Sequence, residues 1–314
     1  MTAVHNERHA PGESSVWLIG NRGMLGTELA LVFEKNGIPF VGTDREVDIT
    51  DAATLRGFTE GKGFDWIVNC AAYTAVDKAE DDVDACRRLN TEGAGNIAAA
   101  AHALGARLIH ISTDYVFNGK GIVEAGAASP RLYREDDVTD PIGVYGLTKR
   151  DGEDAVLANA PDAYIVRTAW LYGAHGGNFV HTMIRLMKER DAVAVVNDQY
   201  GSPTWAFDLA EAVAAFITAA KGERPAPSGI YHYTDEGLAT WFDFASEIYR
   251  QGRALGILAK DCEVRPCTSA EFPAKVKRPA FSVLDKGKIK AALGIGIPDW
   301  DKSLGRYLSQ WPVR

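Results

Sequence analysis

Cysteine is scarce in this sequence, and the few cysteines do not form a recognisable pattern. The 314 residues include only Cys70, Cys86, Cys262 and Cys267, spaced neither as a zinc site nor as a C-x-x-C redox pair. Their scatter predicts reduced thiols in a cytoplasmic protein rather than a secreted protein held by disulfides. The seven histidines are also dispersed, so the sequence predicts no metal site.

Excess basic charge and long apolar runs are lacking as well. Lysine and arginine number 34 against 42 aspartate and glutamate residues, for a net charge of −8, so we expect no nucleic acid as a partner. The Ala-rich stretch 94–106 is too short and too interrupted to span a membrane. Residues 1–14 are polar, without the apolar segment of a signal peptide, and are expected to be a disordered tail. Together these features predict a cytoplasmic protein with no membrane partner.

What the sequence does contain is an alternation of short apolar segments and helical patterns. The apolar segments are typical of buried strands and lie within 15–20, 38–44, 64–72, 107–113 and 162–173. The segments between them have apolar residues at helical spacing and lie within 26–37, 51–61, 84–106 and 144–160. The alternation predicts βαβ units, and therefore an α/β fold with a doubly wound parallel sheet of the Rossmann type.

A glycine-rich loop joins the first expected strand to the first expected helix. It reads IGNRGMLGTEL, with Gly20, Gly23 and Gly26 in the spacing G-x-x-G-x-x-G. Glycines allow the backbone to approach a pyrophosphate closely, and the helix N-terminus offers N–H groups and a positive dipole. Because the loop lies between a strand and a helix, we interpret it as a dinucleotide phosphate site rather than as an ordinary tight turn.

Charged residues near the second expected strand bear on which dinucleotide binds. Asp44 ends that strand, 24 residues after Gly20, where a carboxylate bonds the adenosine ribose of NAD and repels the 2′-phosphate of NADP. Arg22 and Arg45 favour NADP instead, so the sequence leaves both NADH and NADPH open. Asp48 would lie near the adenine if the chain returns toward the loop, although a helix cap explains this residue equally well.

A tyrosine and a lysine four residues apart begin the helix expected at 144–160. Tyr145 and Lys149 share one helix face, and Thr113 ends the strand at 107–113, on the edge where open α/β sheets bind ligands. A free phenol has a pKa of about 10, which we expect a nearby ammonium and a nicotinamide ring to lower. These residues predict an acid–base site in which Lys149 bonds the nicotinamide ribose and Thr113 orients the substrate oxygen. Taken alone, the pair also fits an ordinary helix surface.

The alternation weakens after about residue 173, which predicts a division into two domains. Residues 15–172 are expected to form an NAD(P)-binding Rossmann domain, to which residues 192–222 return. Residues 173–314 are expected to form a smaller, largely C-terminal substrate-binding domain that closes over the carboxyl edge of the sheet. The length of the chain allows such a division.

Several longer motifs carry a resemblance that extends over residues 16–310. They are NCAAYTAVDKAE, STDYVFNG, PIGVYGLTK, RTAWLYG, NDQYGSPT and RPAFSVLD. The sequence resembles the extended short-chain dehydrogenase/reductase family, and within it the members that reduce nucleotide-linked 4-keto-deoxysugars. The resemblance implies an NAD(P)H-dependent oxidoreductase that reduces the C4 keto group of dTDP-4-dehydro-L-rhamnose. This dTDP-deoxyhexose would become dTDP-L-rhamnose, a precursor of cell-wall polysaccharide.

The resemblance also assigns roles to residues by matching motif. It implies catalysis by Thr113, Tyr145 and Lys149, with Tyr145 supplying a proton to the alkoxide formed at C4. It implies sugar binding by Thr113, Asp114 and Trp170, although a tryptophan at a strand end is commonly a core residue. Together with Gly20 and Gly26, the implied cofactor contacts are Gly23, Met24 and Leu25 at the diphosphate, Asp44, Asp48 and Ile49 at the adenosine, and Ala72, Tyr73, Thr74, Tyr145 and Lys149 at the nicotinamide end.

Three further positions have roles that the sequence leaves open. Asn90 either positions a structural water or buttresses the active site. Arg278 either offsets the charge of the substrate diphosphate or belongs to a solvated surface run, KVKRP. Arg22 lies two residues after Gly20, the first glycine of the loop, and bears on the choice between NADH and NADPH.

Other functions on the same fold are open at this point. A 4-ketoreductase with the opposite stereochemistry at C4 would share these motifs. A non-catalytic NAD(P)-binding regulatory subunit would have no need of intact Thr113, Tyr145 and Lys149. A 4,6-dehydratase would place an Asp-Glu pair after the strand-tip threonine, whereas Asp114 and Tyr115 follow here. A homodimer is expected by analogy with the fold.

Overall fold

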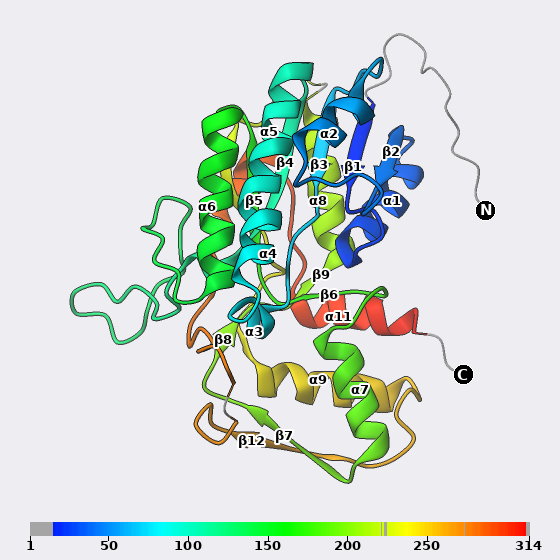
Figure 1. Cartoon of the computed structure of the whole chain (residues 1–314). Coiled ribbons are helices and arrows are strands. Elements are labelled where there is room, and N and C mark those ends of the chain that lie inside the picture. The colour runs from blue at the N-terminus through cyan, green and yellow to red at the C-terminus, as the bar shows by residue number, and fades with distance from the viewer. Residues whose placement is uncertain (1–14, 221, 223–224, 273, 312–314) are drawn as a thin grey trace.

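The computed structural model describes residues 15–220, 222, 225–272 and 274–311, so the expected tail at 1–14 lies outside the described residues. Six parallel strands form the central sheet, in the order β10-β5-β4-β3-β1-β2 (Figure 1). The order reverses between β1 and β3, and α/β sheets bind ligands at such a reversal. The predicted doubly wound, Rossmann-type fold is therefore confirmed. The strands are β1 Val16–Ile19, β2 Phe40–Thr43, β3 Trp66–Asn69, β4 Arg107–Thr113, β5 Tyr164–Thr168 and β10 Gly229–His232.

Both faces of the sheet are covered by helices, because alternate residues of each strand point to opposite faces. Val16 and Leu18 of β1 pack into a core shared with α1 and α8. Trp17 and Ile19 pack into a second core, shared with α2, α5 and α6. Figure 1 shows α5 and α6 side by side over this second face. The bounds are α1 Met24–Lys35, α2 Ala52–Thr59, α5 Gly93–Leu104, α6 Val144–Asn159 and α8 Ala206–Ala219.

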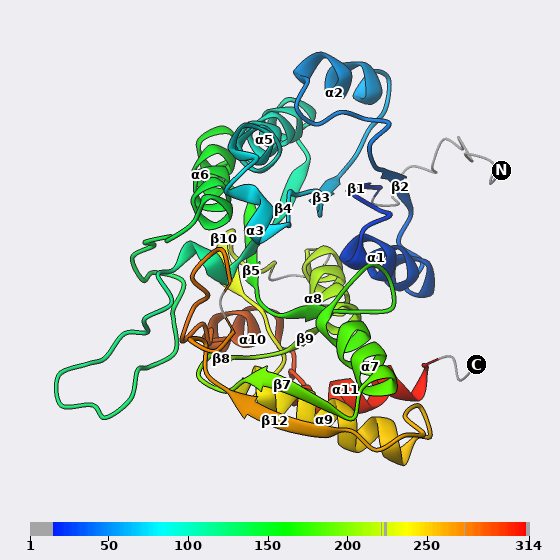
Figure 2. The same ribbon diagram turned by 60° about the horizontal axis from the view of Figure 1, so that its bottom comes forward.

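A second group of elements packs around its own aromatic core, apart from the helices of the sheet (Figure 2). Within this group β7 and β12 pair in parallel, and α7 packs against α9. Thr240 and Asp243 form a capping box that fixes the start of α9, which satisfies two N–H groups at that helix end. The elements are α7 Phe179–Glu189, β7 Ala192–Val196, α9 Trp241–Ala254, β12 Glu263–Cys267 and α11 Trp300–Ser309.

The division between the two groups differs from the expected one in two places. β10 lies in the C-terminal half of the sequence, yet it pairs with β5 at the edge of the main sheet, where Tyr231 is fully buried. β7 lies in the segment 192–222, which the sequence pattern assigns to the sheet domain, yet it pairs with β12 instead. Within that segment, α8 packs against α1. Apolar patterns identify a strand but not the open strand edge with which it pairs.

Two expected elements are interrupted close to the sheet's ligand edge. The helical pattern at 84–106 divides into α4 Val83–Arg87, a π-helical turn Arg88–Glu92, and α5. The strand pattern at 162–173 divides into β5 and β6 Leu171–Tyr172 at Trp170, whose φ is +48°. Such local distortions are frequent at functional sites. The remaining short elements are α3 Val76–Ala79, a 3₁₀ turn Asp114–Val116, β8 Tyr200–Gly201, β9 Thr204–Trp205, β11 Ala239–Thr240 and α10 Gly287–Leu293.

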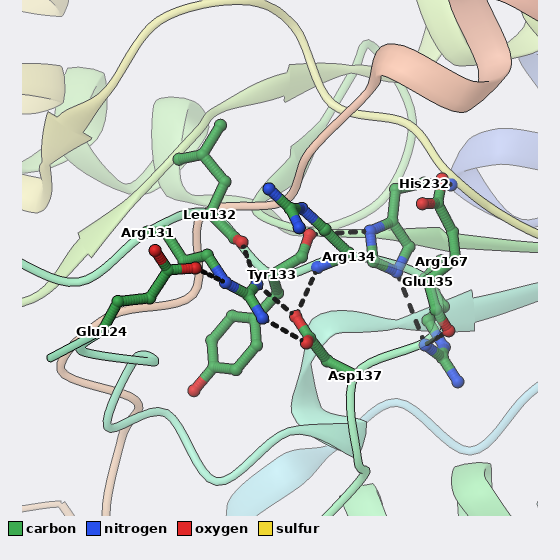
Figure 3. Close-up of polar contacts among 9 residues, drawn as sticks. All are labelled: Glu124, Arg131, Leu132, Tyr133, Arg134, Glu135, Asp137, Arg167 and His232. Carbon is green, nitrogen blue, oxygen red and sulfur yellow. Dashed lines mark hydrogen bonds and ion pairs between the residues drawn. The ribbon is translucent and has the colours of Figure 1, made fainter.

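The long connection between β4 and α6 is held in place by charged side chains (Figure 3). Arg131 donates to the two carboxylate oxygens of Asp137 at 2.7 and 2.6 Å. The Glu135 carboxylate accepts a hydrogen bond from the backbone nitrogen of His232 in β10 at 3.2 Å. The backbone carbonyl of Glu135 accepts one from Arg167 in β5 at 3.4 Å. These contacts attach the connection to two strands of the sheet, so that α6 begins beside the end of β4.

Three kinds of feature are absent from the part of the chain that the structure describes: membrane-spanning helices, clusters of metal ligands and disulfides. No helix within the described ranges has the length and apolar character needed to cross a membrane. In the same residues, no three His, Cys, Asp or Glu side chains are grouped so that they could hold a metal ion. All four cysteines are free thiols.

Candidate active site

The glycine loop forms an open cradle between β1 and α1. Gly20 has a φ of +79°, and a Cβ atom there would lie 2.8 Å from the backbone nitrogen of Ala71. A Cβ atom at Gly26 would lie only 2.1 Å from the Gly20 carbonyl oxygen. Gly23 is the N-cap of α1, and no side chain in the described part of the sequence caps that end. The tight packing of these glycines brings the uncapped N-terminus of α1 close to the end of β1, which suits the pyrophosphate of a dinucleotide.

Met24 and Leu25 begin α1 directly after this cradle. The Leu25 side chain is buried in the apolar core between α1 and the sheet. Leu25 can therefore offer a ligand only its backbone N–H group. Met24 is half-buried, and its side chain approaches Gly173, which follows β6.

A charged group lies at the end of β2. Arg22 Nε is 3.8 Å from Asp44 Oδ2, and the same guanidinium pairs with Glu46. Glu46 accepts in turn from the backbone nitrogen of Asp44 at 2.9 Å. The group offers a carboxylate suited to ribose hydroxyls and a guanidinium suited to a 2′-phosphate, so its geometry accommodates either NADH or NADPH.

Asp48 and Ile49 occupy different environments. Asp48 is exposed, and its carboxylate accepts from the backbone nitrogen and hydroxyl of Thr50 at 2.9 and 2.8 Å. The N-cap of α2 is Asp51, so Asp48 is not a helix cap. Ile49 is buried and packs against Gly93 of α5, so only its backbone is free to face an adenine.

Asn90 holds the segment that follows β3, which contains Ala72, Tyr73 and Thr74. Its Oδ1 accepts from the Tyr73 backbone nitrogen at 2.8 Å, and its Nδ2 donates to the Tyr73 carbonyl at 3.1 Å. The same Nδ2 donates to the Thr148 hydroxyl of α6 at 3.2 Å. The π-helical turn places Asn90 in this buried position. These contacts are those of a buttress, and they tie the segment to α6.

Thr113, Tyr145 and Lys149 meet where β4 ends and α6 begins. Thr113 is the last residue of β4; its hydroxyl donates to Asp114 Oδ1 at 3.1 Å and lies near the phenol of Tyr145, whose pKa it lowers. Lys149 follows one turn after Tyr145 and is 2% exposed. Gly146 allows the close approach of α6, because a Cβ atom there would lie 2.2 Å from the Tyr115 carbonyl oxygen. The three side chains that the sequence pattern predicts as a group thus lie together.

Burial determines how the two titratable members of this group are protonated. It raises the pKa of Tyr145 above its usual value, and the nearby Thr113 hydroxyl offsets only part of that rise. It lowers the pKa of Lys149 to about 8, against the charge of Glu153, which raises it. The expected lowering of the Tyr145 pKa by Lys149 is therefore wrong for this chain by itself. The Lys149 amine instead donates to the Ile111 carbonyl at 2.7 Å.

A buried imidazole contacts Lys149 from the sheet. His110 of β4 is 1% exposed, and its Nε2 lies 3.4 Å from Lys149 Nζ. Its Nδ1 lies 3.0 Å from Nδ2 of Asn69, the neighbouring residue on β3. Asn69 Oδ1 accepts in turn from the backbone nitrogen of Ala71 at 3.0 Å. Both ring nitrogens of this buried histidine therefore lie within hydrogen-bonding distance of neighbouring side chains.

A buried ion pair fixes α6 against the sheet. Arg167 of β5 donates from Nε and Nη2 to the Glu153 carboxylate at 2.9 and 2.7 Å. The exposed fractions of the two side chains are only 3% and 4%. Such bidentate pairs have a fixed geometry, so the pair sets the rotation of α6 and with it the positions of Tyr145 and Lys149. Figure 3 shows Arg167 beside His232 of the neighbouring strand.

A cavity of about 680 Å³ lies next to this group, a size typical of small-molecule sites. Tyr115 lines the cavity, and its ring packs edge-on against that of Tyr145, with 5.5 Å between the ring centroids. The cavity walls come from segments far apart in the sequence. They include Asp77, Asp114, Trp170, Trp241, Phe272 and Arg278.

Asp114 and Trp170 face this cavity in unusual states. Asp114 is buried, and its Oδ2 has no hydrogen-bond partner among the described residues. Burial raises the pKa of Asp114 to about 6. Trp170 has a left-handed backbone conformation and stacks on Trp241, with ring centroids 3.5 Å apart. A strained bulky residue that is held by its packing is a common sign of a functional position.

Ion pairs lie at the wall of the cavity, which Asp77, Lys275 and Arg278 line. Arg278 pairs with Asp77 of α3, and Lys275 pairs with Asp81. Arg278 Nη1 also lies 3.4 Å from the Tyr115 hydroxyl. Arg278 is therefore a cavity residue and not part of a solvated surface run. The pairs bring two positive side chains to the cavity mouth.

Sequence reasoning missed the residues that support the site from behind. Asn69 and the Glu153–Arg167 pair act through partners that lie far away in the sequence. The available signal was a polar residue within an apolar strand pattern, since buried polar groups need hydrogen-bond partners. Trp241 carried no such signal, because it begins an ordinary amphipathic helix pattern.

Several known proteins are similar to this chain in sequence, and a solved structure is similar to it in fold. A family model described as RmlD substrate binding domain matches residues 14–312. The chain is 47% identical over 279 residues to a dTDP-4-dehydrorhamnose reductase of Streptomyces griseus, which covers 88% of this chain and 87% of that protein. It is 40% identical over 291 residues to a dTDP-4-keto-6-deoxy-D-glucose reductase of Streptomyces niveus, which covers 92% and 94%.

A solved structure shows the same likeness in three dimensions. The dTDP-4-dehydrorhamnose reductase of Bacillus anthracis, in complex with NADP, has a TM-score of 0.86 with this chain at 34% sequence identity. The likeness covers 95% of this chain and 100% of that one. With the family model matching nearly the whole length, the chain belongs to the family of the RmlD substrate binding domain.

Proposed function

We propose that the chain is an NAD(P)H-dependent oxidoreductase that reduces the C4 keto group of dTDP-4-dehydro-L-rhamnose to give dTDP-L-rhamnose. The observation that carries this proposal is the meeting of Thr113, Tyr145 and Lys149 close to both a glycine cradle and a large cavity. The relatives from Streptomyces griseus and Bacillus anthracis, which are named dTDP-4-dehydrorhamnose reductases, support it.

The glycine loop would hold the cofactor diphosphate at the start of α1, because Gly20 and Gly26 let the loop pack tightly against its own backbone and no side chain in the described residues caps the helix there. Asp44 or Arg22 would hold the adenosine end, and Lys149 the nicotinamide ribose. When bound, NADH or NADPH supplies the hydride that C4 receives. The relative that was solved with NADP supports a dinucleotide at this position, and the choice between the two cofactors is left open.

Tyr145 acts as the proton donor to the oxygen at C4. Because its pKa is raised, the phenol is protonated at neutral pH and ready to donate. Thr113, whose hydroxyl donates to Asp114 in this structure, would orient the sugar oxygen beside Tyr145. The Lys149 ammonium adds positive charge on the same helix face, which favours the phenolate left after transfer. Proton transfer of this kind contributes on the order of 10²–10⁴-fold to the rate.

The cavity would hold the dTDP-sugar. The unpartnered Oδ2 of Asp114 would accept from a sugar hydroxyl, and the Trp170 ring would pack against the sugar. Lys275 and Arg278 would offset the negative charge of the diphosphate at the cavity mouth. To do so, the two cations would exchange Asp77 and Asp81, with which they pair in this structure, for the diphosphate.

The test is turnover of the proposed substrate. The purified chain is mixed with enzymatically made dTDP-4-dehydro-L-rhamnose, and the oxidation of NADH and of NADPH is followed separately. The configuration at C4 of the product is then read by NMR. We expect dTDP-L-rhamnose from the native chain and almost none from the Tyr145→Phe variant. Tight cofactor binding without turnover would instead indicate a binding subunit.

A second candidate is a 4-ketoreductase that yields the opposite configuration at C4. The 40% identity to the dTDP-4-keto-6-deoxy-D-glucose reductase of Streptomyces niveus favours it. The two activities differ in the face of the sugar that is presented to the nicotinamide. A product epimeric at C4 in the same NMR experiment would decide for this candidate. The expected homodimer and the cytoplasmic location stay predictions.

A further inference from the structure

His110 stands between two side chains that both donate hydrogen bonds. Its Nδ1 faces the Asn69 amide nitrogen at 3.0 Å, and its Nε2 faces the Lys149 amine at 3.4 Å. Burial, reinforced by the charge of Lys149, lowers the pKa of His110 well below its usual value, so the ring is neutral at neutral pH. A neutral imidazole has one N–H group and one lone pair. It can therefore accept a hydrogen bond from only one of the two donors.

The backbone beside Asn69 decides which nitrogen carries the ring proton. Asn69 Oδ1 accepts from the backbone nitrogen of Ala71 at 3.0 Å, so the amide atom that faces His110 is the donor Nδ2. His110 Nδ1 must then accept, and the ring proton lies on Nε2, pointing at Lys149. A charged ammonium has no lone pair to receive it. A neutral amine does have one, so this hydrogen bond forms only with uncharged Lys149.

We propose that His110 is a positioning residue that stabilises the neutral amine of Lys149 during proton return to Tyr145. This inference rests on the proposed function and deepens it. When Tyr145 gives its proton to the C4 alkoxide, it becomes a phenolate. A proton from the Lys149 ammonium then passes to the phenolate, which leaves a neutral phenol and a neutral amine. His110 donates to that amine until solvent returns a proton to it.

The other neighbours of Lys149 do not perform this role. Glu153 favours the charged ammonium, although Arg167 binds its carboxylate. The two nearby cysteine thiols are neutral, because burial raises the pKa of both. His110 is thus the hydrogen-bonding neighbour that requires the uncharged amine. The groups that act on Lys149 are Glu153 on α6, Cys70 after β3, Cys86 on α4, and His110 and Ile111 on β4, and Tyr145 precedes it by one turn on the same helix face.

The first test is the tautomer of His110 in the wild-type chain, with and without NADPH. With ¹⁵N-labelled histidine, long-range ¹H–¹⁵N spectra identify the ring nitrogen that carries the proton, and the His110 signal is assigned by its loss in His110→Gln. We expect a neutral ring protonated at Nε2 around neutral pH. A proton on Nδ1 would overturn the proposal, whether or not any variant folds.

The second test is the titration of Lys149 in His110→Gln. The glutamine carbonyl can accept from an ammonium, so the Lys149 pKa should rise by about one unit, a tenfold change in the ratio of charged to neutral amine. Lysine ¹³Cε NMR measures this, with the Lys149 signal identified by its absence in Lys149→Arg. His181→Gln is the matched control, because His181 is half-buried and bonds the Tyr307 hydroxyl instead.

Kinetics separate this role from a merely structural one. In His110→Gln, the pH at which kcat declines on the alkaline side should rise together with the Lys149 pKa. At neutral pH, kcat should fall by about tenfold, while KM for the sugar stays constant. A folded His110→Gln chain with an unchanged Lys149 titration would overturn the proposal. Failure of the wild-type chain to reduce the sugar would instead overturn the proposed function, and leave the tautomer and titration tests intact.

Discussion

The cofactor region and the substrate region of this molecule are built from different materials. The proposed cofactor region, between β1, β2 and α1, is mainly backbone: Gly20 N donates to the Thr43 carbonyl at 2.7 Å, and Gly20 and Gly26 pack too closely against neighbouring backbone to admit a Cβ atom. The substrate region gathers side chains such as Trp170, Trp241 and Arg278 from distant segments. In the proposed function, backbone would bind the diphosphate that all dinucleotides share, whereas side chains would select the sugar.

The two regions also differ in the strain that they hold. Trp170 keeps a left-handed conformation, which costs on the order of 1–3 kcal/mol in a non-glycine residue. Asp114 keeps a buried carboxyl group, one oxygen of which has no hydrogen-bond partner within the part of the chain that the structure describes. Natural chains break local rules of this kind mainly at functional sites. Substitutions in the substrate region should therefore exchange stability for activity, and those in the cofactor region should act through backbone position.

The largest effect is expected at Tyr145, which lies between the two regions. Tyr145→Phe removes the proton donor but keeps the ring, so kcat should fall by about 10²–10⁴-fold. The affinity for NADPH should stay the same, because the glycine cradle is untouched. Steady-state kinetics and fluorescence titration measure the two quantities. Tyr249→Phe, in α9, is the control and should leave both unchanged. If Tyr145→Phe kept most of its activity, Tyr145 would not be the proton donor.

The next largest effect is expected in Gly26→Ala, which tests whether NADPH binding depends on the backbone position of the glycine loop. In Gly26→Ala the new Cβ atom would lie 2.1 Å from the Gly20 carbonyl, so the loop must move. Overpacking of this kind costs about 1–3 kcal/mol, which predicts NADPH binding weaker by about tenfold to a hundredfold. Calorimetric titration measures it. Gly57→Ala is the matched control, since its Cβ atom meets nothing within 4 Å. Equal affinities in the two variants would contradict a backbone cradle.

The glycine loop and the Tyr145–Lys149 pair could each be predicted from sequence, because the members of each motif lie close together in the chain. The glycine spacing and the Tyr145–Lys149 pair depend on one turn or one helix face, and local chemistry determines both. Thr113 was predictable because a strand pattern ended there. The direction of the Tyr145 pKa shift was not, since it depends on how deeply the assembled fold buries the phenol.

The substrate region could not be predicted in the same way. Trp241 and Asp77 reach the cavity only through the pairing of distant elements, and no local spacing encodes that pairing. For the same reason, the sequence did not predict that β7 pairs with β12 or that β10 joins the main sheet. Apolar periodicity predicts that a strand exists, whereas its partner is set by which edge and which face the rest of the chain leaves open.

Asp114→Asn should show the exchange of stability for activity. The pKa of Asp114 is raised from 3.8 to about 6 in the fold, so the protonated form stabilises the fold. That contribution is present below pH 3.8 and is lost as the pH rises through about 6. At pH values above 6 the asparagine variant should therefore be more stable by on the order of 2–3 kcal/mol, yet weaker in turnover.

Denaturant unfolding of Asp114→Asn at acidic and at neutral pH measures this difference. The gain should shrink as the pH falls, because the wild-type carboxyl group then becomes protonated. Asp162→Asn, at an exposed turn, is the control and should show no such pH dependence. A variant that is less stable than the native chain at neutral pH would mean that the Asp114 carboxylate is well paired in the fold.

The smallest effect is expected at the cavity mouth, where Arg278 is partly exposed and its charge is screened. Arg278→Ala should raise KM for the dTDP-sugar by about tenfold at low salt, with kcat nearly unchanged, because a charge at the rim of a site acts mainly on association. The effect should diminish as salt is added. Arg265→Ala removes an exposed arginine that pairs with Glu263 and controls for net charge. An equal rise in KM for both variants would assign the effect to the overall field of the molecule. A rise confined to Arg278→Ala would instead locate diphosphate recognition at the mouth, in the region that the sequence could not assemble.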